Sequence, residues 1–362
     1  MSTSATKRIA FYAPMKSPRH PVPSGDREMA RNLIDIISTG GAQVDLVTEL
    51  KIFDKNGDAA VQALLRTKAA QEVERLCTEM PPVDLWVTYH NYYKAPDLIG
   101  PQVARIRGIP YVQIESTRAA RRLTGPWAGF AKSAHEAADT AAVIFYLTAN
   151  DLITLERDKH PDQTLQSLPP FLPSATLPHA STLDGPMLSV GMMRAGDKLA
   201  SYQIIADSLQ GLQGDWQLQI AGDGPARPAV EALMAPFAER VSFLGQLSRA
   251  ELAKIYEQAS LFFWPGVNEA FGMVYLEAQS HGIPVVAQDR PGMRDVLAPG
   301  HYPDVAQGKE ALTIRLQELL NAPNLRQKLG AKARERIAVN HLAPAASARF
   351  WSAVAPLIEE SR

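Results

Sequence analysis

The sequence predicts an α/β protein built from two doubly wound, Rossmann-like domains. Short strand-like runs alternate with longer helical patterns along its 362 residues. Many of these runs are apolar on both faces, as parallel strands covered by helices are. One proline-rich stretch interrupts the alternation near the middle of the chain. A chain of this length also suits two domains better than a single core.

The first half opens with a strand at residues 8–13. A helix follows from about Gly25, with apolar residues recurring every fourth position. The next strand, at residues 44–48, precedes a long helical pattern over residues 59–77. Further strands are predicted at residues 85–89, 109–114 and 141–147. Together these segments predict an N-terminal domain over residues 1–168.

The stretch that interrupts the alternation, residues 166–186, contains five prolines and no clear periodicity. We therefore predict a linker at residues 169–186. A C-terminal domain at residues 187–344 then repeats the strand–helix alternation. Its strands are predicted at residues 187–192, 216–222, 241–245, 261–266 and 283–287. An amphipathic helix over residues 345–362 ends the chain and is expected to pack back on the first domain.

Composition excludes several function classes. The formal net charge is −1, so no overall field favours nucleic acid or an anionic membrane. Cys77 is the single cysteine, which suits a reducing compartment. The N-terminus has no long apolar segment, and no run approaches the ~20 apolar residues of a membrane span. These features predict a soluble, cytoplasmic protein that binds no nucleic acid, with peripheral membrane contact left open.

The stretch "NEAFGMVYLEAQSHGIPVVA" at residues 268–287 places one carboxylate before a predicted helix and another inside it. At ~1.5 Å rise per residue, Glu269 and Glu277 lie on the order of 10 Å apart. That separation is too long for two carboxylates acting on one bond, but it leaves room for a ligand between them. The helix start favours an anion, and Gly272 removes side-chain bulk there. The alternative is structural: a charge at the helix start and a solvated face.

This stretch resembles the E-x7-E motif of the retaining GT-B glycosyltransferases, the group 1 or family 4 enzymes. Three further segments are similar to the same family: "LQIAGDGPARPAVEAL", "VSFLGQLSRAELAKIYEQASLFFWPGVNEAFG" and "LGAKARERIAVNH". The resemblance covers residues 187–341 well, and the N-terminal half mainly in strand–helix order. It implies two Rossmann-like domains facing a cleft.

The resemblance also implies roles for the second domain. Glu269 would hold the donor sugar, and Glu277 the ribose. Arg194 and Lys198 would hold the diphosphate, where negative charge builds as the glycosidic bond breaks. This segment departs from the family, because two methionines separate Arg194 from the glycine that ends the strand. Other donor-binding positions carried over from the family are Phe271, Gly272, Met273, Gly222, Gly224 and Gly245. The glycines are equally compatible with plain tight turns, and the two cations with an ordinary exposed loop.

The first domain fits the family less well. Relatives carry a glycine-rich loop after the first strand, whereas this chain has only Gly25 in a basic loop. Relatives also carry a histidine after the fourth strand, where this chain has Glu115, Ser116 and Arg118. His90 ends a strand and is predicted to point toward the cleft. His90 and Glu115 are therefore candidates for acceptor binding, with a structural role as the alternative.

Metal and cofactor motifs are absent from the sequence: there is no Cys/His cluster with ligand spacing, no compact Asp-x-Asp and no Walker A. We therefore predict a metal-independent hexosyltransferase that needs no cofactor besides its nucleotide diphosphate sugar donor. Its acceptor, whether saccharide, lipid-linked or small molecule, is not specified by the sequence. Two alternatives stay open: a nucleotide-sugar epimerase of the same fold, and a non-catalytic sugar-nucleotide binding protein.

Overall fold

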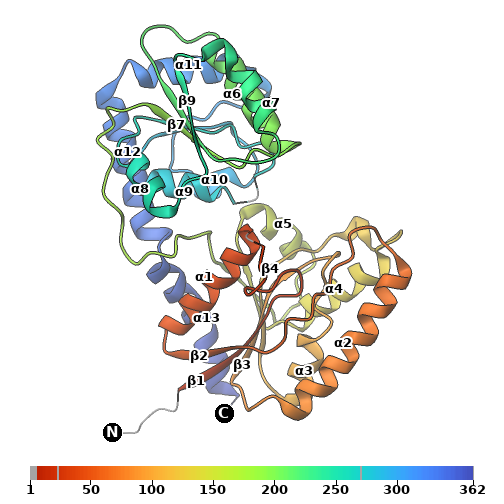
Figure 1. Cartoon of the computed structure of the whole chain (residues 1–362). Helices are drawn as coiled ribbons and strands as arrows, with labels where there is room; N and C mark the ends of the chain where they lie inside the picture. The colour runs from red at the N-terminus through yellow and green to blue at the C-terminus, as the bar shows by residue number, and fades with distance from the viewer. Residues whose placement is uncertain (1–5, 23, 270, 362) are drawn as a thin grey trace, which may run out of the picture. The chain divides into compact units, whose positions relative to one another are not determined.

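The computed structural model describes residues 6–22, 24–269 and 271–361. Their contacts form two compact units, one of Met1–Pro169 with Ala343–Arg362 and the other of Pro170–Leu342. Each unit is a parallel β-sheet with helices on both faces (Figure 1). The α/β prediction is therefore confirmed for both halves of the chain.

The first unit contains a six-stranded sheet in the order β2-β1-β3-β4-β5-β6, with every pair parallel. Its strands are β1 (Lys7–Tyr12), β2 (Ala42–Leu46), β3 (Leu85–Asn91), β4 (Tyr111–Ser116), β5 (Val143–Tyr146) and β6 (Thr164–Ser167). Its helices are α1 (Gly25–Thr39), α2 (Ala59–Glu79), α3 (Gly100–Arg107), α4 (Ala128–Thr140), α5 (Ala149–Arg157) and α13 (Ala343–Glu360), with a 3-10 turn η1 (Ala120–Arg122). The edge strand β6 was not predicted, because it is short and only partly buried.

The C-terminal helix α13 packs beside α1 in the first unit (Figure 1). Phe350 is fully buried and stacks on Phe145 of β5, with ring centroids 5.3 Å apart. The Ser347 hydroxyl donates to the Ile36 carbonyl oxygen at 2.7 Å. Gly40 lies so close to Trp351 that a Cβ there would sit 1.6 Å from the indole nitrogen. The last helix is thus an integral part of the first core.

The second unit contains a five-stranded parallel sheet in the order β11-β10-β7-β8-β9. Its strands are β7 (Met187–Val190), β8 (Leu218–Ala221), β9 (Val241–Gly245), β10 (Phe262–Phe263) and β11 (Val285–Val286). Its helices are α6 (Asp197–Leu209), α7 (Arg227–Met234), α8 (Arg249–Tyr256), α9 (Met273–Ser280), α10 (Met293–Val296), α11 (Gly308–Leu320) and α12 (Pro323–Asn340), with 3-10 turns η2 (Ala235–Phe237) and η3 (Val305–Gln307). Its hydrophobic core includes Trp264 and Tyr202.

Local sequence explains where several helices begin. Ser24 caps α1 by accepting from the Arg27 backbone N–H at 3.3 Å. Ser248 and Glu251 form a reciprocal capping box at the start of α8. The proline-rich residues 170–186 run along the second unit, where the Ser181 and Thr182 backbone N–H groups donate to the His281 and Glu257 carbonyl oxygens at 2.7 and 3.0 Å.

Candidate active site

Strand order identifies where a ligand would bind in the second unit. The chain winds one way from β7 through β8 to β9 and the other way through β10 to β11, so the direction reverses between β7 and β10. In open α/β sheets, ligands bind outside the carboxyl ends of the strands at such a reversal. The segment after β7 carries Arg194 and leads to Lys198 in the first turn of α6, and the segment after β10 carries Glu269. Three sequence-predicted residues therefore meet at this switch point.

Glu269 has two partners within this unit. The Lys198 ammonium group contacts its Oε1, and the Trp264 indole N–H donates to the same oxygen at 3.0 Å. The Lys198 nitrogen also lies 5.2 Å from the centre of a Trp264 ring. Side-chain exposure is 31% for Lys198 and 14% for Glu269, so the pair is partly shielded from water. The structure thus brings together two residues that the sequence predicted for different parts of the donor.

The loop that carries Glu269 is tied to the start of α6. The Val267 backbone N–H donates to the Ser201 hydroxyl at 3.2 Å, and the Asn268 side-chain amide donates to Asp197 Oδ1 at 3.0 Å. Asn268 adopts a positive φ of 48°, a conformation that is uncommon outside glycine and clusters at functional sites. These contacts fix the position of the Glu269 carboxyl group relative to Lys198.

Helix α9 begins at Met273. Gly272 has a left-handed φ of 56°, which the right-handed helix cannot include. A Cβ there would lie 2.4 Å from the Tyr275 ring, so only glycine fits. Phe271 and Met273 flank it and are half-buried. Among the described residues no side chain caps this helix start, which leaves an end that favours an anion.

Glu277 lies in the second turn of α9. Its Oε2 accepts from the Tyr256 hydroxyl at 3.1 Å, and the Tyr256 ring stacks on His281 with centroids 5.1 Å apart. Burial raises the pKa of the Glu277 carboxyl group, although the Tyr256 hydrogen bond and the Arg249 charge oppose that shift. The two carboxylates of the motif therefore have separate sets of partners.

The glycines after β8 allow close backbone packing. A Cβ on Gly222 would lie 1.9 Å from the Gly191 carbonyl oxygen, and one on Gly224 would lie 2.4 Å from that of Met193. The Gly222 backbone N–H donates to the Gly245 carbonyl oxygen at 2.8 Å. These glycines let the loop after β8 lie directly against the segment that carries Arg194. Their contacts are thus structural, and a nucleotide contact stays a prediction.

Arg194 is exposed at the end of this segment. No ion pair or side-chain hydrogen bond of its guanidinium group is found within the described part of the chain. A guanidinium group free of carboxylate partners is suited to bind phosphate oxygens. Arg194 and Lys198 therefore differ, since only Lys198 is already engaged.

The switch point of the first unit lies between β1 and β3. His90, the next-to-last residue of β3, is flanked there by two carboxylates. Its Nδ1 lies 3.5 Å from Asp26 Oδ1 at the start of α1, and its Nε2 lies 3.8 Å from Glu115 Oε1 in β4. Gly25 precedes Asp26 and is exposed. The structure therefore brings His90, Glu115 and the start of α1 together, and it adds Asp26, which the sequence analysis did not single out.

Burial and charge perturb this cluster strongly. Burial raises the pKa of Glu115 to about 7, with the Asp26 and Asp151 charges adding to the rise and His90 opposing it. Burial opposes a charge on His90, yet Glu115 and Asp26 raise the pKa of the imidazole overall. His90 and Glu115 both adopt left-handed backbone conformations, with φ of 68° and 58°. Strain of this kind and perturbed pKa values both concentrate at functional sites.

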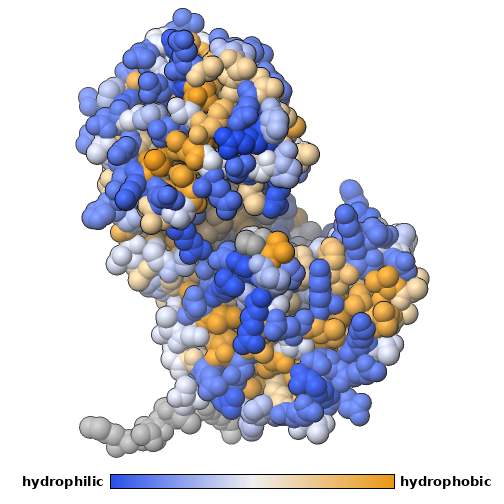
Figure 2. Space-filling view, in the orientation of Figure 1, coloured by the Kyte–Doolittle hydropathy of each residue, from blue (hydrophilic) through white to orange (hydrophobic). Residues whose placement is uncertain are grey.

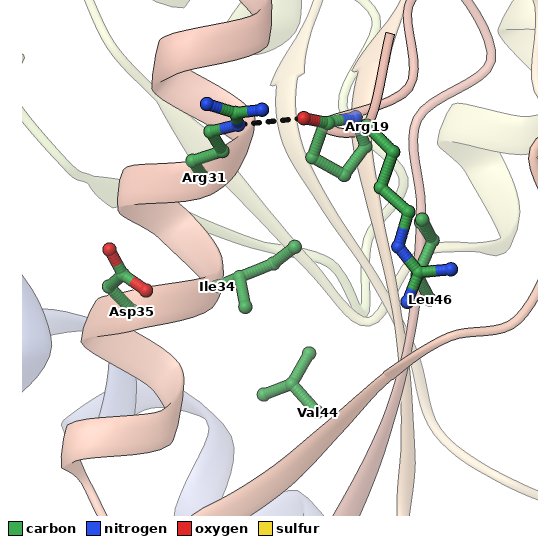
Figure 3. A pocket seen from close by; sticks show the side chains of 7 residues that line it. Arg19, Arg31, Ile34, Asp35, Val44 and Leu46 are labelled. Carbon is green, nitrogen blue, oxygen red and sulfur yellow. Dashed lines mark hydrogen bonds between the residues drawn. The ribbon is translucent and has the colours of Figure 1, made fainter.

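In the basic loop after β1, arginine side chains bond to the loop's own backbone and to a neighbouring carboxylate. The Arg27 guanidinium group donates to the His20 carbonyl oxygen at 3.0 Å and pairs with Glu28 at 2.8 Å. Arg31 donates to the Pro18 carbonyl oxygen at 2.7 Å, above an apolar floor of Ile34 and Val44 (Figure 3). The guanidinium groups of Arg27 and Arg31 therefore already have partners within the first unit and stabilise the conformation of this loop.

The sequence analysis did not identify Asp26, Trp264 and Tyr256 as site residues. Asp26 follows the Ser24 cap directly, a weak signal in itself. Trp264 ends a strand-like run and Tyr256 lies in an ordinary helical pattern, so neither has a spacing signal. Ser116 and Arg118, which lie where relatives carry a histidine, are buried and internally bonded: Arg118 pairs with Asp139 at 2.6 Å.

Among the described residues, no group of three or more His, Cys, Asp or Glu side chains is arranged to hold a metal ion. None of the described helices is long and apolar enough to cross a membrane. On the face seen in Figure 2, apolar residues form separate patches bordered by hydrophilic ones.

Comparison with known proteins assigns the class. Residues 199–336 match the family described as "Glycosyl transferases group 1". The chain is 27% identical over 271 residues to the alpha-D-kanosaminyltransferase of Streptomyces kanamyceticus, covering 68% of each protein. It is 28% identical over 159 residues to the sulfoquinovosyl transferase SQD2 of Arabidopsis thaliana, covering 41% of this chain and 29% of that protein.

The likeness extends further in structure than in sequence. The crystal structure of Anabaena HepE in complex with UDP is similar to this chain with a TM-score of 0.72 and 15% sequence identity, over 96% of this chain and 100% of that one. By sequence, the chain spans only 22 to 34% of the length of the first curated relatives it matches.

The two parallel sheets, their switch-point residues and these similarities define a protein of the GT-B architecture. Over its residues 199–336, the chain is similar to the group 1 glycosyltransferases. This match agrees with the group 1 glycosyltransferase family that the E-x7-E stretch predicted, and it does not test retention.

Proposed function

We propose that the chain transfers a hexose from a nucleotide diphosphate sugar to an acceptor hydroxyl, with retention at the anomeric carbon. The observation that carries the proposal is the meeting of Lys198, Glu269 and the uncapped start of α9 at the β7/β10 switch point. This place combines positive charge and free backbone N–H groups with a carboxylate that accepts hydrogen bonds from hydroxyls. The relatives' names describe glycosyl transfer, and the HepE structure contains UDP.

Each residue has a distinct role in this proposal. Arg194 and Lys198 bind the diphosphate and stabilise the charge that develops on it as the leaving group departs. Glu269 accepts hydrogen bonds from hydroxyls of the sugar being transferred. Glu277 accepts from the ribose hydroxyls, while Tyr256 fixes its second oxygen.

The reaction needs no protein nucleophile. The bond between the anomeric carbon and the phosphate oxygen breaks, the bond to the acceptor oxygen forms on the same face, and the leaving phosphate takes the acceptor proton. Because the cations stabilise the leaving group, we propose that no metal ion is required. The Lys198–Glu269 contact keeps both side chains in position before the donor binds.

Two measurements test the proposal. Calorimetry with UDP, GDP and ADP identifies the base, and NMR of the product then gives its anomeric configuration. We expect one nucleotide to bind and the product to keep the donor's configuration. An inverted product contradicts the same-face mechanism. Donor turnover without acceptor indicates an epimerase, and nucleotide binding with no transfer to any acceptor in a panel indicates a binding protein.

A further inference from the structure

Two cations share two aromatic rings on the first unit. Arg122 Cζ lies 5.0 Å from the Tyr93 ring centre and 5.2 Å from that of Trp127. Lys94 Nζ lies 5.7 and 5.5 Å from the same two rings. The rings meet edge to face, with centroids 5.8 Å apart. We call Tyr93, Lys94, Arg122 and Trp127 the cation–aromatic cluster.

The cation–aromatic cluster is held by hydrogen bonds between three loops. The Trp127 indole N–H donates to the Asp54 carbonyl oxygen at 3.2 Å, and the Asp54 backbone N–H donates to the Lys94 carbonyl oxygen at 2.9 Å. The Gln62 side chain donates to the Pro126 carbonyl oxygen at 3.0 Å. The rings are therefore positioned by the fold before any ligand arrives, which lowers the entropic cost of binding.

The charges of the cluster are not balanced locally. Within the described residues, neither Lys94 nor Arg122 forms an ion pair with a carboxylate. The carboxyl group of Asp54 is directed inward, where it accepts from Gln62 at 2.7 Å and from the Asn56 backbone N–H at 2.9 Å. Two like charges on the same pair of rings repel one another, and an anion bound between them would remove that repulsion.

The cluster is connected to His90 by a row of rings. His90 and Tyr92 lie 4.7 Å apart, and Tyr92 and Tyr93 lie 5.6 Å apart, between centroids. Tyr93 follows β3 and Trp127 follows β4, so the row runs along the carboxyl edge of the sheet, where ligands bind. A ligand with a ring that stacks on this row can place a hydroxyl at His90 and Glu115 and an anionic group at Lys94 and Arg122.

We propose that the cation–aromatic cluster is the acceptor's anion subsite, so that the acceptor is a hydroxylated ring compound carrying a phosphate or carboxylate group. The inference rests on the proposed glycosyl transfer, because it names the acceptor of that reaction. The anionic group can belong to a soluble sugar acid or sugar phosphate, or to a phospholipid headgroup.

Binding experiments with matched probes test the subsite. Glucose 6-phosphate and glucuronate are compared with glucose by saturation-transfer NMR and calorimetry, with saturating nucleoside diphosphate present to occupy the donor site. Vesicles of phosphatidylinositol, whose headgroup is a hydroxylated ring on a phosphate, are compared with vesicles of phosphatidylcholine by flotation. We expect at least one anionic probe to bind about tenfold more tightly than its neutral match. If only a soluble anionic probe is preferred over its neutral match, the acceptor is soluble. If only the anionic vesicles are preferred, the acceptor is a lipid headgroup.

Variants localise the effect. The double variant Lys94→Gln/Arg122→Gln should lose the roughly tenfold higher affinity for the anionic probe over its neutral match. Arg121→Gln, which changes an exposed neighbouring arginine that stacks on neither ring, should leave it within about twofold. If no anionic probe is preferred, or if Arg121→Gln has the same effect as the double variant, the inference is wrong. Binding of the nucleoside diphosphate to the unmodified protein is measured separately. If the nucleotide does not bind, the proposed glycosyl transfer itself is wrong, whatever the result for the anion subsite.

Discussion

The two switch points of this molecule are built from opposite electrostatics. At β7/β10 in the second unit, a carboxylate is paired with a lysine and an indole N–H, and an exposed arginine stands nearby. At β1/β3 in the first unit, one histidine lies between two carboxylates on strained backbone. The first arrangement suits a fixed, highly charged diphosphate. The second suits hydroxyl groups, which exchange hydrogen bonds with carboxylates and imidazole. In the proposed function, donor and acceptor are therefore recognised by different kinds of side chain.

The largest effect expected concerns the buried carboxyl group of the first unit. Glu115 has a folded-state pKa of about 7, above its ordinary value of 4.5. The protonated carboxyl group therefore adds to the free energy of unfolding at acidic pH, and this contribution is lost as the pH rises from about 4.5 through 7. The raised pKa of His90 acts in the same direction at higher pH. A shift of this size corresponds to on the order of 3 kcal/mol.

Urea unfolding between pH 5 and 8 measures this effect. The free energy of unfolding of the unmodified protein should fall as the pH rises, and Glu115→Gln should flatten that dependence. Glu74→Gln, which changes an exposed glutamate on α2, serves as the matched control and should leave the slope unchanged. Equal slopes in the unmodified protein and the Glu115 variant would show that the carboxyl group ionises normally, and the contrast between the two switch points would be lost.

Catalysis should depend most on Glu269. Replacing it by glutamine keeps an acceptor for the Trp264 N–H but removes the charge that binds the transferred sugar as its geometry changes at the barrier. A lost charged hydrogen bond of ~2–3 kcal/mol lowers kcat by roughly 30- to 150-fold. Steady-state kinetics should show kcat falling more than KM rises. Glu239→Gln, an exposed position in the same unit, should leave both unchanged, and a pure KM effect in Glu269→Gln would contradict this role.

The smallest effect expected is that of metal removal. Lys198 and Arg194 supply the positive charge for the diphosphate in our proposal, so transfer should be unchanged in EDTA. Rates measured with EDTA, then with added Mg²⁺ or Mn²⁺, check this. Complete loss of activity that either metal restores would show that these two cations are not sufficient.

The sequence predicted the second unit better than the first, for a physical reason. The residues around Glu269 and Glu277 lie on one short helix and the loop before it, so their spacing in sequence reflects their spacing in space. Lys198 joins them only through the parallel strand order, which brings β7 beside β10. Both strands are short: β10 has only two residues, so periodicity could not define them closely.

The first unit shows what sequence spacing cannot provide. Asp26, His90 and Glu115 come from three elements separated by 64 and 25 positions, and only the fold brings them together. The positive φ values of His90 and Glu115 have no sequence signature, because neither residue type requires that conformation. The cation–aromatic cluster likewise depends on loops after β2, β3 and β4 meeting at one edge.

The central claim, that the second unit holds a nucleotide sugar between its two glutamates, is tested most directly by calorimetry with free UDP and GDP. A nucleoside diphosphate has ribose and phosphates but no sugar. Glu277→Ala should therefore weaken its binding about tenfold, a loss of ~1.4 kcal/mol. Glu269→Gln should leave its binding almost unchanged, since a nucleoside diphosphate lacks the sugar that Glu269 binds in our proposal. If both variants bind the nucleotide like the unmodified protein, the two carboxylates do not flank a nucleotide sugar and the account is wrong.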